Sequence, residues 1–238
     1  MTKRKIFLIV LILILIISVL HFLQHYGPFA PRFCDQFDST VSNKYADLIR
    51  KLNNYSTCRD PKYNIFDNYI YWKGEIIAAT KNDVLVFKGS DTWQDWSYDL
   101  MPYKGERLFS DIELIYNDIK DKINEIDSKR SINVITGWSL GAILSCMTGL
   151  DFKTDIKSVI LFGLPNIFTE NFIKQYNAKL GSKTIVYNHI LDIFVNAFGY
   201  GKNRENIGQT KWVESPLIES HKLLTGGLAH FHMSYLKK

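Results

Sequence analysis

Residues 131–144 constrain the fold of this chain more than any other segment. They begin with a short β-branched run, continue into Gly137-Trp138-Ser139-Leu140-Gly141, and end in a small, apolar, helix-forming stretch. Glycines two residues before and two residues after a serine are typical of a strand-to-helix turn too sharp to leave room for a Cβ at either position. Such a turn lifts the serine hydroxyl out of the sheet and aims the first amides of the next helix at an oxyanion beside it. The segment therefore predicts a nucleophile elbow with Ser139 as the nucleophile.

Strand and helix patterns alternate along the rest of the chain. Short apolar runs predict strands at residues 69–72, 76–79, 84–87, 132–135, 158–162 and 184–187. Apolar residues at helical spacing predict helices at residues 39–52, 111–127, 141–150 and 168–176. This alternation predicts the α/β class, with a mainly parallel central sheet flanked by helices on both faces. Reactive groups in such sheets lie at the carboxyl ends of the strands.

The N-terminus carries a separate signal. Residues 6–20 are apolar except for Ser18, and Lys3-Arg4-Lys5 precedes them. The run is long, and Ala30 is followed by Pro31, a poor context for cleavage, so a retained anchor is favoured over a cleaved signal peptide. We expect a cytoplasmic stub and transmembrane signal anchor over residues 1–23, a linker over 24–37 and an α/β-hydrolase domain over 38–238. The basic cluster predicts that this domain is lumenal or extracellular on a single-pass membrane protein, or secreted if the anchor is cleaved.

The cysteines and the charge distribution are consistent with that compartment. Cys34 and Cys58 flank the first globular segment and are candidates for a disulfide, whereas Cys146 is expected to be a buried free thiol. Asn54-Tyr55-Ser56 is a glycosylation sequon. The net charge is +5, but the longest basic run, Lys3-Arg4-Lys5, lies at the N-terminus, and no basic stripe with interleaved aromatic residues follows. A nucleic-acid partner is therefore not expected.

A serine nucleophile requires a histidine that takes its proton and a carboxylate that orients the histidine. On sheets of this type the chain order is serine, acid, histidine. Asp192 follows the predicted strand 184–187, although a helix N-cap is an alternative role for it. His230 and His232, near the C-terminus, are the histidine candidates, and His189 is expected to be structural. The alternative of a two-histidine metal site lacks further ligands, so no metal or cofactor is expected.

Four segments resemble the class 3 (fungal-type) lipase family of α/β-hydrolases. Residues 136–142 (TGWSLGA) are similar to its elbow, TGHSLGG, with tryptophan in place of the usual histidine. Residues 87–96 (FKGSDTWQDW) resemble its FRG[ST] segment, with lysine in place of arginine. Residues 161–166 (LFGLPN) are similar to FGxPR, and residues 191–195 (LDIFV) resemble the motif that carries the family's acid.

The resemblance implies roles that periodicity does not assign. Ser90 and the Leu140 amide would form the oxyanion hole, and residues 92–100, with Trp93 and Trp96, would form a mobile aromatic lid that contacts lipid. Some family members place the histidine three residues before a tyrosine, which selects His232. Others place it five residues before, which selects His230. We favour His232, with His230 as the alternative.

These observations predict a lipase or esterase that acts on lipid carboxylic esters such as acylglycerols. Ser139, Asp192 and His232 would be its triad, and Ser90 with Leu140 would hold the oxyanion. The expected partners are a lipid ester substrate and a membrane, reached through the N-terminal anchor and the lid. One alternative is a catalytically silent relative that binds lipid or another protein through the same fold. Another is a hydrolase of peptides or thioesters.

Overall fold

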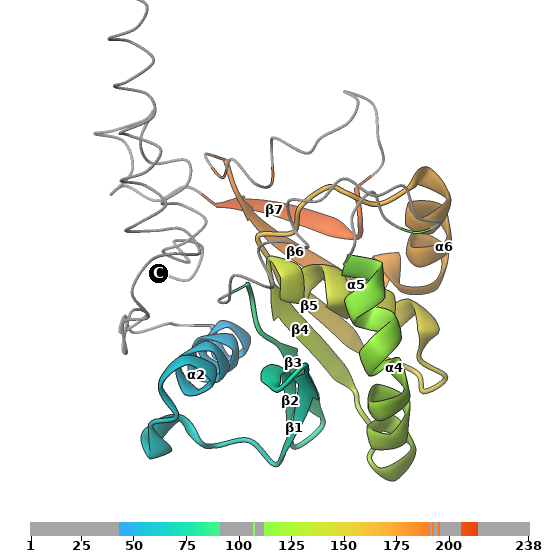
Figure 1. The fold of residues 1–238 in the computed structure, drawn as a ribbon. Helices are drawn as coiled ribbons and strands as arrows, with labels where there is room; N and C mark the ends of the chain where they lie inside the picture. Colours follow the sequence, from blue (N-terminus) through green and yellow to red (C-terminus); the bar gives the residue numbers. More distant parts are fainter. Residues whose placement is uncertain are drawn as a thin grey trace, which may run out of the picture.

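The computed structural model describes residues 43–90, 107, 112–190, 192, 195 and 206–213. Within them, the strands form one sheet in the order β1-β2-β3-β4-β5-β6-β7, so strands consecutive in the chain lie side by side (Figure 1). The strands are β1 (Asn68–Trp72), β2 (Glu75–Lys81), β3 (Val84–Phe87), β4 (Val134–Trp138), β5 (Ser158–Phe162), β6 (Thr184–His189) and β7 (Gln209–Val213). The helices are α2 (Lys44–Cys58), α4 (Ile112–Lys129), α5 (Leu140–Asp151), α6 (Glu170–Leu180) and the 3-10 helices η1 (Pro61–Tyr63) and η2 (Gly181–Lys183).

The direction of the strands explains where the helices lie. Strands β1, β2 and β3 are antiparallel, and each pair from β3 to β7 is parallel. Parallel neighbours need a crossover connection, and α4, α5 and α6 supply it between β3 and β4, β4 and β5, and β5 and β6. Because crossovers are right-handed and the strand order is sequential, the three helices lie on the same face of the sheet (Figure 1).

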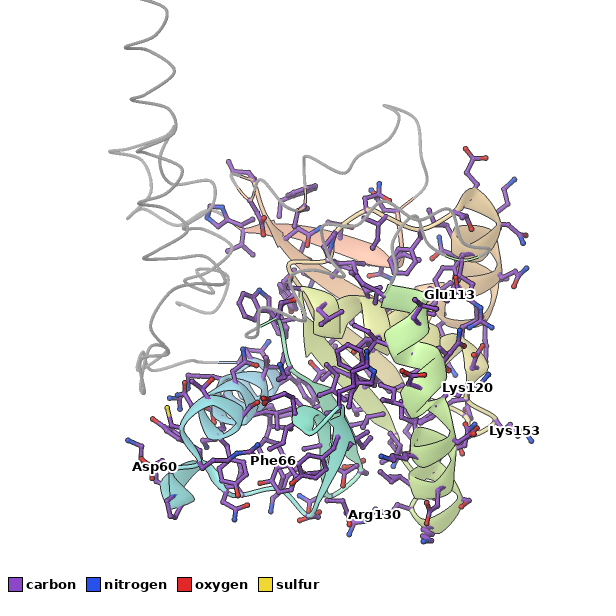
Figure 2. The ribbon with its side chains drawn as sticks, viewed as in Figure 1. Asp60, Phe66, Glu113, Lys120, Arg130 and Lys153 are labelled. Carbon is purple, nitrogen blue, oxygen red and sulfur yellow. The ribbon has the colours of Figure 1, made fainter. Side chains whose placement is uncertain are left out.

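Helix α2 covers the opposite face. Its apolar residues Ala46, Ile49 and Leu52 recur every third position and pack in one cluster with Trp138 of β4. Figure 2 shows Phe66 between α2 and the first strands, whereas Lys120 and Lys153 lie on the outer side of the molecule. Strand β4 is buried along its whole length, as expected for a parallel strand covered on both faces. The predicted mainly parallel sheet with flanking helices is therefore confirmed.

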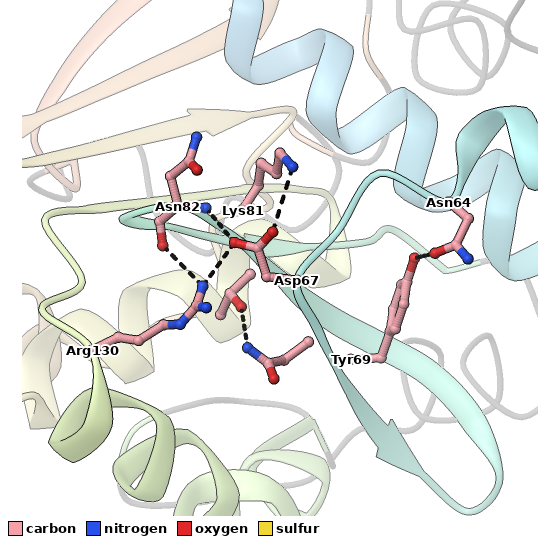
Figure 3. A network of polar contacts seen from close by, with 8 residues as sticks. Asn64, Asp67, Tyr69, Lys81, Asn82 and Arg130 are labelled. Carbon is pink, nitrogen blue, oxygen red and sulfur yellow. Dashed lines mark hydrogen bonds and ion pairs between the residues drawn. The ribbon is translucent and has the colours of Figure 1, made fainter.

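A polar network closes the amino-terminal end of the sheet, opposite the carboxyl ends of the parallel strands (Figure 3). Asp67, just before β1, accepts hydrogen bonds from Arg130 after α4 at 2.8 Å and from the amide of Asn82 at 2.8 Å. Lys81, at the end of β2, pairs with the same carboxylate at 3.4 Å. This network joins the β2–β3 turn to the end of α4.

Two differences from the predicted elements have a physical cause. Helix α2 continues to Cys58, beyond the predicted end at residue 52. The sequence pattern did not predict this extension because the residues buried there, Asn53, Asn54 and Ser56, are polar, and apolar periodicity does not detect them. Strand β7 is not apparent in the sequence pattern, since it lies at the sheet edge and all five of its residues are exposed or half-buried.

The predicted anchor (residues 1–23) and linker (24–37) lie outside the described residues. Among the helices that the structure describes, none combines the length and the apolar composition that a bilayer crossing requires.

Candidate active site

Ser139 lies between the last residue of β4 and the first residue of α5. Its φ of 54° and ψ of −119° are a backbone conformation that residues with a side chain rarely adopt. Its amide donates a hydrogen bond to the carbonyl oxygen of Phe162 on β5 at 3.0 Å, and its own carbonyl accepts the amide of Ala142 at 2.9 Å. The first bond fixes the turn to the sheet, and the second begins the helix. The predicted strand–turn–helix context of Ser139 is thus present.

The two glycines of the elbow pack against backbone. A Cβ on Gly137 would lie 2.1 Å from the carbonyl oxygen of Gly141, and a Cβ on Gly141 would lie 2.3 Å from that of Lys88. Atoms do not approach so closely, and backbone carbonyls cannot rotate away as a flexible side chain can. Both positions therefore require glycine for the reason that the sequence predicts.

The residues expected to form the oxyanion hole lie on the two segments that these contacts join. Leu140 is the first residue of α5, so its amide is one of the free amides at the helix N-terminus. Ser90 is two residues beyond Lys88, whose carbonyl packs on Gly141. The end of β3 and the start of α5 are thus in contact. That arrangement suits two amides that point at one oxygen.

Asp192 follows β6 by three residues and is fully buried. Its amide donates to the carbonyl of His189 at 3.0 Å, which ties it to the end of β6. Its Oδ1 accepts the amide of Val195 at 3.2 Å, the contact expected of the alternative N-cap role. A carboxylate has two oxygens, so this bond is compatible with a second one to a histidine. The role of Asp192 as the acid of the triad stays a prediction.

His230, His232 and residues 92–100 lie outside the described residues, and so does His221. His189 is described: it ends β6 and is buried, with 1% of its surface exposed. No group of three or more His, Cys, Asp or Glu side chains that could hold a metal ion comes together in the part of the chain that the structure describes.

Cys146 is a further nucleophilic side chain near the elbow. It lies on α5, one turn beyond Ala142, and is a buried free thiol, as the sequence predicts. Burial raises the pKa of the Cys146 thiol well above its usual range, so the thiol stays protonated at neutral pH. Because the thiolate is the reactive form of cysteine, Cys146 does not compete with Ser139.

Two supporting residues were not identified from the sequence. Asn188, near the end of β6, accepts the amide of Leu164 at 2.9 Å, so it links the loop after β5 to the strand that precedes Asp192. Asn53, on α2, accepts the amide of Gly89 at 3.3 Å. Both asparagines are buried and bond to partners 36 and 24 residues away, so no local sequence pattern identifies them.

Comparison with known proteins connects this geometry to a family. The family model described as lipase (class 3) matches residues 84–199, which include β3, the elbow and the loop of Asp192. A structure of Rhizomucor miehei triacylglyceride lipase shares the fold with a TM-score of 0.52 at 12% identity, over 74% of this chain and 82% of that one. The native propeptide complex of Rhizomucor miehei lipase gives 0.52 at 14% identity, over 74% and 71%.

No curated protein matches the chain. The structural likeness is at low sequence identity and therefore concerns the fold. The family match rests on the sequence of the segment that carries the elbow. Residues 84–199 thus match the class 3 lipase family, and the sheet and helices around them have the fold of a fungal lipase.

Proposed function

We propose that this chain is a serine acyl hydrolase, a lipase or esterase that cleaves lipid carboxylic esters through an acyl-enzyme. The observation that carries the proposal is the strained Ser139 between β4 and α5, held by glycines that tolerate no side chain. A residue kept in such a conformation is typical of functional sites, where the surrounding fold compensates for the strain. The class 3 lipase match over the same segment supports a lipase-type hydrolase.

In the first half of the proposed reaction, the Ser139 hydroxyl attacks the ester carbonyl carbon. His232, or His230 as the alternative, takes the hydroxyl proton, and Asp192 orients the imidazole and stabilises its charged form. The carbonyl oxygen becomes an oxyanion, which accepts hydrogen bonds from Ser90 and from the Leu140 amide. When the tetrahedral intermediate collapses, the alcohol leaves with the proton held by the histidine.

In the second half, water replaces the alcohol. The same histidine removes a proton from water, which attacks the acyl carbon, and the fatty acid leaves as Ser139 regains its proton. Every step uses protein groups and water. The aromatic residues at 92–100 would contact the lipid when the lid is open, as the resemblance implies, and we propose acylglycerols as the substrate class.

The direct test uses the full chain and a fluorophosphonate probe, which reacts with an activated serine. Wild-type protein should be labelled and should hydrolyse p-nitrophenyl esters, with a preference among chain lengths that reports the acyl site. Ser139→Ala should lose both activities while keeping its fold, because removal of the nucleophile lowers kcat by about 10⁶-fold in a serine hydrolase. Ser145→Ala is the matched control, since Ser145 is a buried serine of α5, six residues beyond Ser139, whose hydroxyl donates to the carbonyl of Gly141.

The same measurement separates the alternatives. A silent relative would bind lipid vesicles without labelling or turnover. A peptidase or thioesterase would be labelled at Ser139 but would prefer amide or thioester substrates to the esters. Labelling that persists in Ser139→Ala would place the nucleophile elsewhere and contradict the mechanism.

We further propose that the domain lies outside the cytoplasm, on a single N-terminal membrane anchor. Cys58, at the end of α2, takes part in a disulfide, and disulfides are rare in reducing compartments. The sequon gives no such support, because Asn54 is 2% exposed and its Nδ2 is buried. Full-length protein should sediment with membranes, and a chain that begins at Phe37 should be soluble. An uncleaved full-length protein in the soluble fraction would contradict the anchor.

The chain has three cysteines, and Cys146 is free. We therefore propose Cys34 as the partner of Cys58. Peptide mapping without reductant should yield one linked peptide pair that contains Cys34 and Cys58 and disappears on reduction. Detection of both as free thiols in exported protein would contradict the pairing.

A further inference from the structure

The side chain of Asn53 reaches from α2 to the segment that leads to Ser90. Its Oδ1 accepts the amide hydrogen of Gly89 at 3.3 Å, and both groups are buried. Asn53 is 1% exposed and directly follows Leu52, which belongs to the apolar cluster between α2 and the sheet. A buried polar side chain without a partner destabilises the fold, so an asparagine here needs a bond such as the one to Gly89.

This bond takes over where the strand ladder ends. The amide of Lys88, one residue beyond the end of β3, donates to the carbonyl of Ile77 on β2 at 3.1 Å. At the next residue, Gly89, the amide bonds to a side chain instead of a neighbouring strand. Asn53 therefore fixes the backbone just before Ser90.

Two further contacts confine Gly89. The ring of Trp138 lies against it so closely that a Cβ would be 2.3 Å from Cε3 of the indole. The ammonium of Lys88, whose side chain is fully buried, lies 3.4 Å from the carbonyl oxygen of Gly89. Gly89 thus has a side-chain partner for its amide, a second for its carbonyl, and an aromatic ring over its Cα.

We propose that Asn53 is a positioning residue for the oxyanion hole: its bond to Gly89 holds the Ser90 amide in the direction that the oxyanion requires. The inference rests on the proposed function and adds a residue on α2, outside the segment that matches the family. Oxyanion donors act because they are oriented before the reaction, and a misplacement of about 1 Å can lower the rate about 100-fold. Asn53 touches no substrate atom and acts through the peptide backbone.

Asn53→Leu tests the inference, because leucine has a similar size and cannot accept a hydrogen bond. We expect the rate of fluorophosphonate labelling and kcat to fall about 10- to 100-fold while KM stays within about two-fold, since the lost interaction belongs to the transition state. Asn53→Asp keeps the acceptor oxygen and should return the labelling rate to within about three-fold of wild type.

Asn54→Leu is the matched control. Asn54 is the next residue of α2, is equally buried, and has an Nδ2 without a hydrogen-bond partner among the described residues. Its side chain does not share the bond that Asn53 makes to Gly89, so its substitution should leave the labelling rate unchanged. Thermal unfolding of both leucine variants shows whether a loss of activity reflects a loss of fold. If Asn53→Leu does not fold, Asn53→Ala, which adds no bulk, replaces it in the same comparison.

The outcomes distinguish this inference from the proposed function. If wild type is not labelled at all, the proposed function fails. If wild type is labelled at Ser139 and Asn53→Leu reacts at the wild-type rate, the positioning role is wrong. The role is equally wrong if Asn53→Asp is as slow as Asn53→Leu, or if Asn54→Leu is slowed to the same degree. Slow labelling of Asn53→Leu alone, with recovery in Asn53→Asp, supports it.

Discussion

The carbonyl oxygen of Gly141 lies 2.1 Å from the position that a Cβ on Gly137 would occupy. These two glycines precede and follow Ser139, one at the end of β4 and one in the first turn of α5. Gly141 in turn packs on the carbonyl of Lys88, one residue beyond the end of β3. One chain of backbone contacts thus joins the elbow to the segment that carries Ser90, so the geometry of the elbow and that of the oxyanion hole depend on each other.

The first prediction concerns this contact. Gly137→Ala should lower the free energy of unfolding by at least about 3 kcal/mol or prevent folding, because the new methyl group meets a carbonyl that cannot move away. Gly181→Ala is the control. Gly181 has helical backbone angles, and a methyl group on it would lie 3.2 Å from its nearest neighbour, the side chain of Asn177, and not against a backbone carbonyl. Its effect should stay within about 1 kcal/mol. Denaturant unfolding measures both, and equal stabilities would contradict the proposed clash.

The second prediction concerns the strain at Ser139. Glycine adopts positive φ without a steric penalty, whereas alanine keeps the Cβ that causes the strain. The free energy of unfolding of Ser139→Gly should therefore be about 1 kcal/mol higher than that of Ser139→Ala. Both variants lack the nucleophile and should be inactive. Thermal unfolding of the pair gives the difference. Equal stability would mean that the conformation of Ser139, with φ of 54°, stores little energy in the folded protein.

The third prediction concerns the network in Figure 3. The bonds from Arg130 and from the Asn82 amide hold the pKa of Asp67 below its ordinary value of 3.8. A carboxylate with a lowered pKa stabilises the fold above its unfolded-state pKa, and this contribution is lost as the pH falls through the folded-state value. Asp67→Asn should thus be less stable than wild type at pH 7, by about 1 kcal/mol or less for a pair near the surface.

The difference between Asp67→Asn and wild type should shrink as the pH falls below 3.8. Asp155→Asn is the control: Lys183 also lowers the pKa of Asp155, but the Asp155 side chain is 86% exposed, so solvent screens the pair. It should show no measurable change at either pH. A deficit for Asp67→Asn that is constant from neutral to acid pH would show that packing, and not charge, is responsible.

The fold was predictable where burial leaves a periodic pattern. Strands β3, β4 and β5 are covered on both faces and give short apolar runs in the sequence. Helix α4 is covered on one face and gives an apolar stripe at helical spacing. The edge strand β7 has no buried face to impose such a pattern. The sequence pattern did not predict the second half of α2, because the residues buried there are polar and hydrophobic periodicity does not detect polar residues.

The candidate site divides in the same way. Ser139 and its glycines were predictable because the elbow is local: its requirements fall within five consecutive residues. Asn53 could not be predicted, since its partner Gly89 is 36 residues away and the contact depends on how α2 crosses the sheet. The choice between His230 and His232 also depends on a contact between distant segments, because the base must come from the C-terminal segment and reach Asp192.

The fourth prediction therefore concerns the histidine. The base must reach both the Ser139 hydroxyl and the Asp192 carboxylate, at about 2.6–3.2 Å in the reacting complex. His230 and His232 are two residues apart, so on a helix their side chains would diverge by about 200°. The ending Tyr-Leu-Lys-Lys favours a helix that starts near these residues. We expect one of His230→Ala and His232→Ala to lose nearly all turnover and the other to lose little.

We expect His232 to be the essential one, because His-Met-Ser-Tyr has the spacing to tyrosine that selects it in the resemblance to class 3 lipases. Steady-state turnover and fluorophosphonate labelling of the two variants decide it, since the base assists attack on the probe as well as on an ester. Comparable large losses in both variants would favour a strand, on which residues two apart share a face. Wild-type turnover in both would exclude the C-terminal segment as the source of the base. His189, buried at the end of β6 and bonded through its carbonyl to the Asp192 amide, and His221 would then be the next residues to replace.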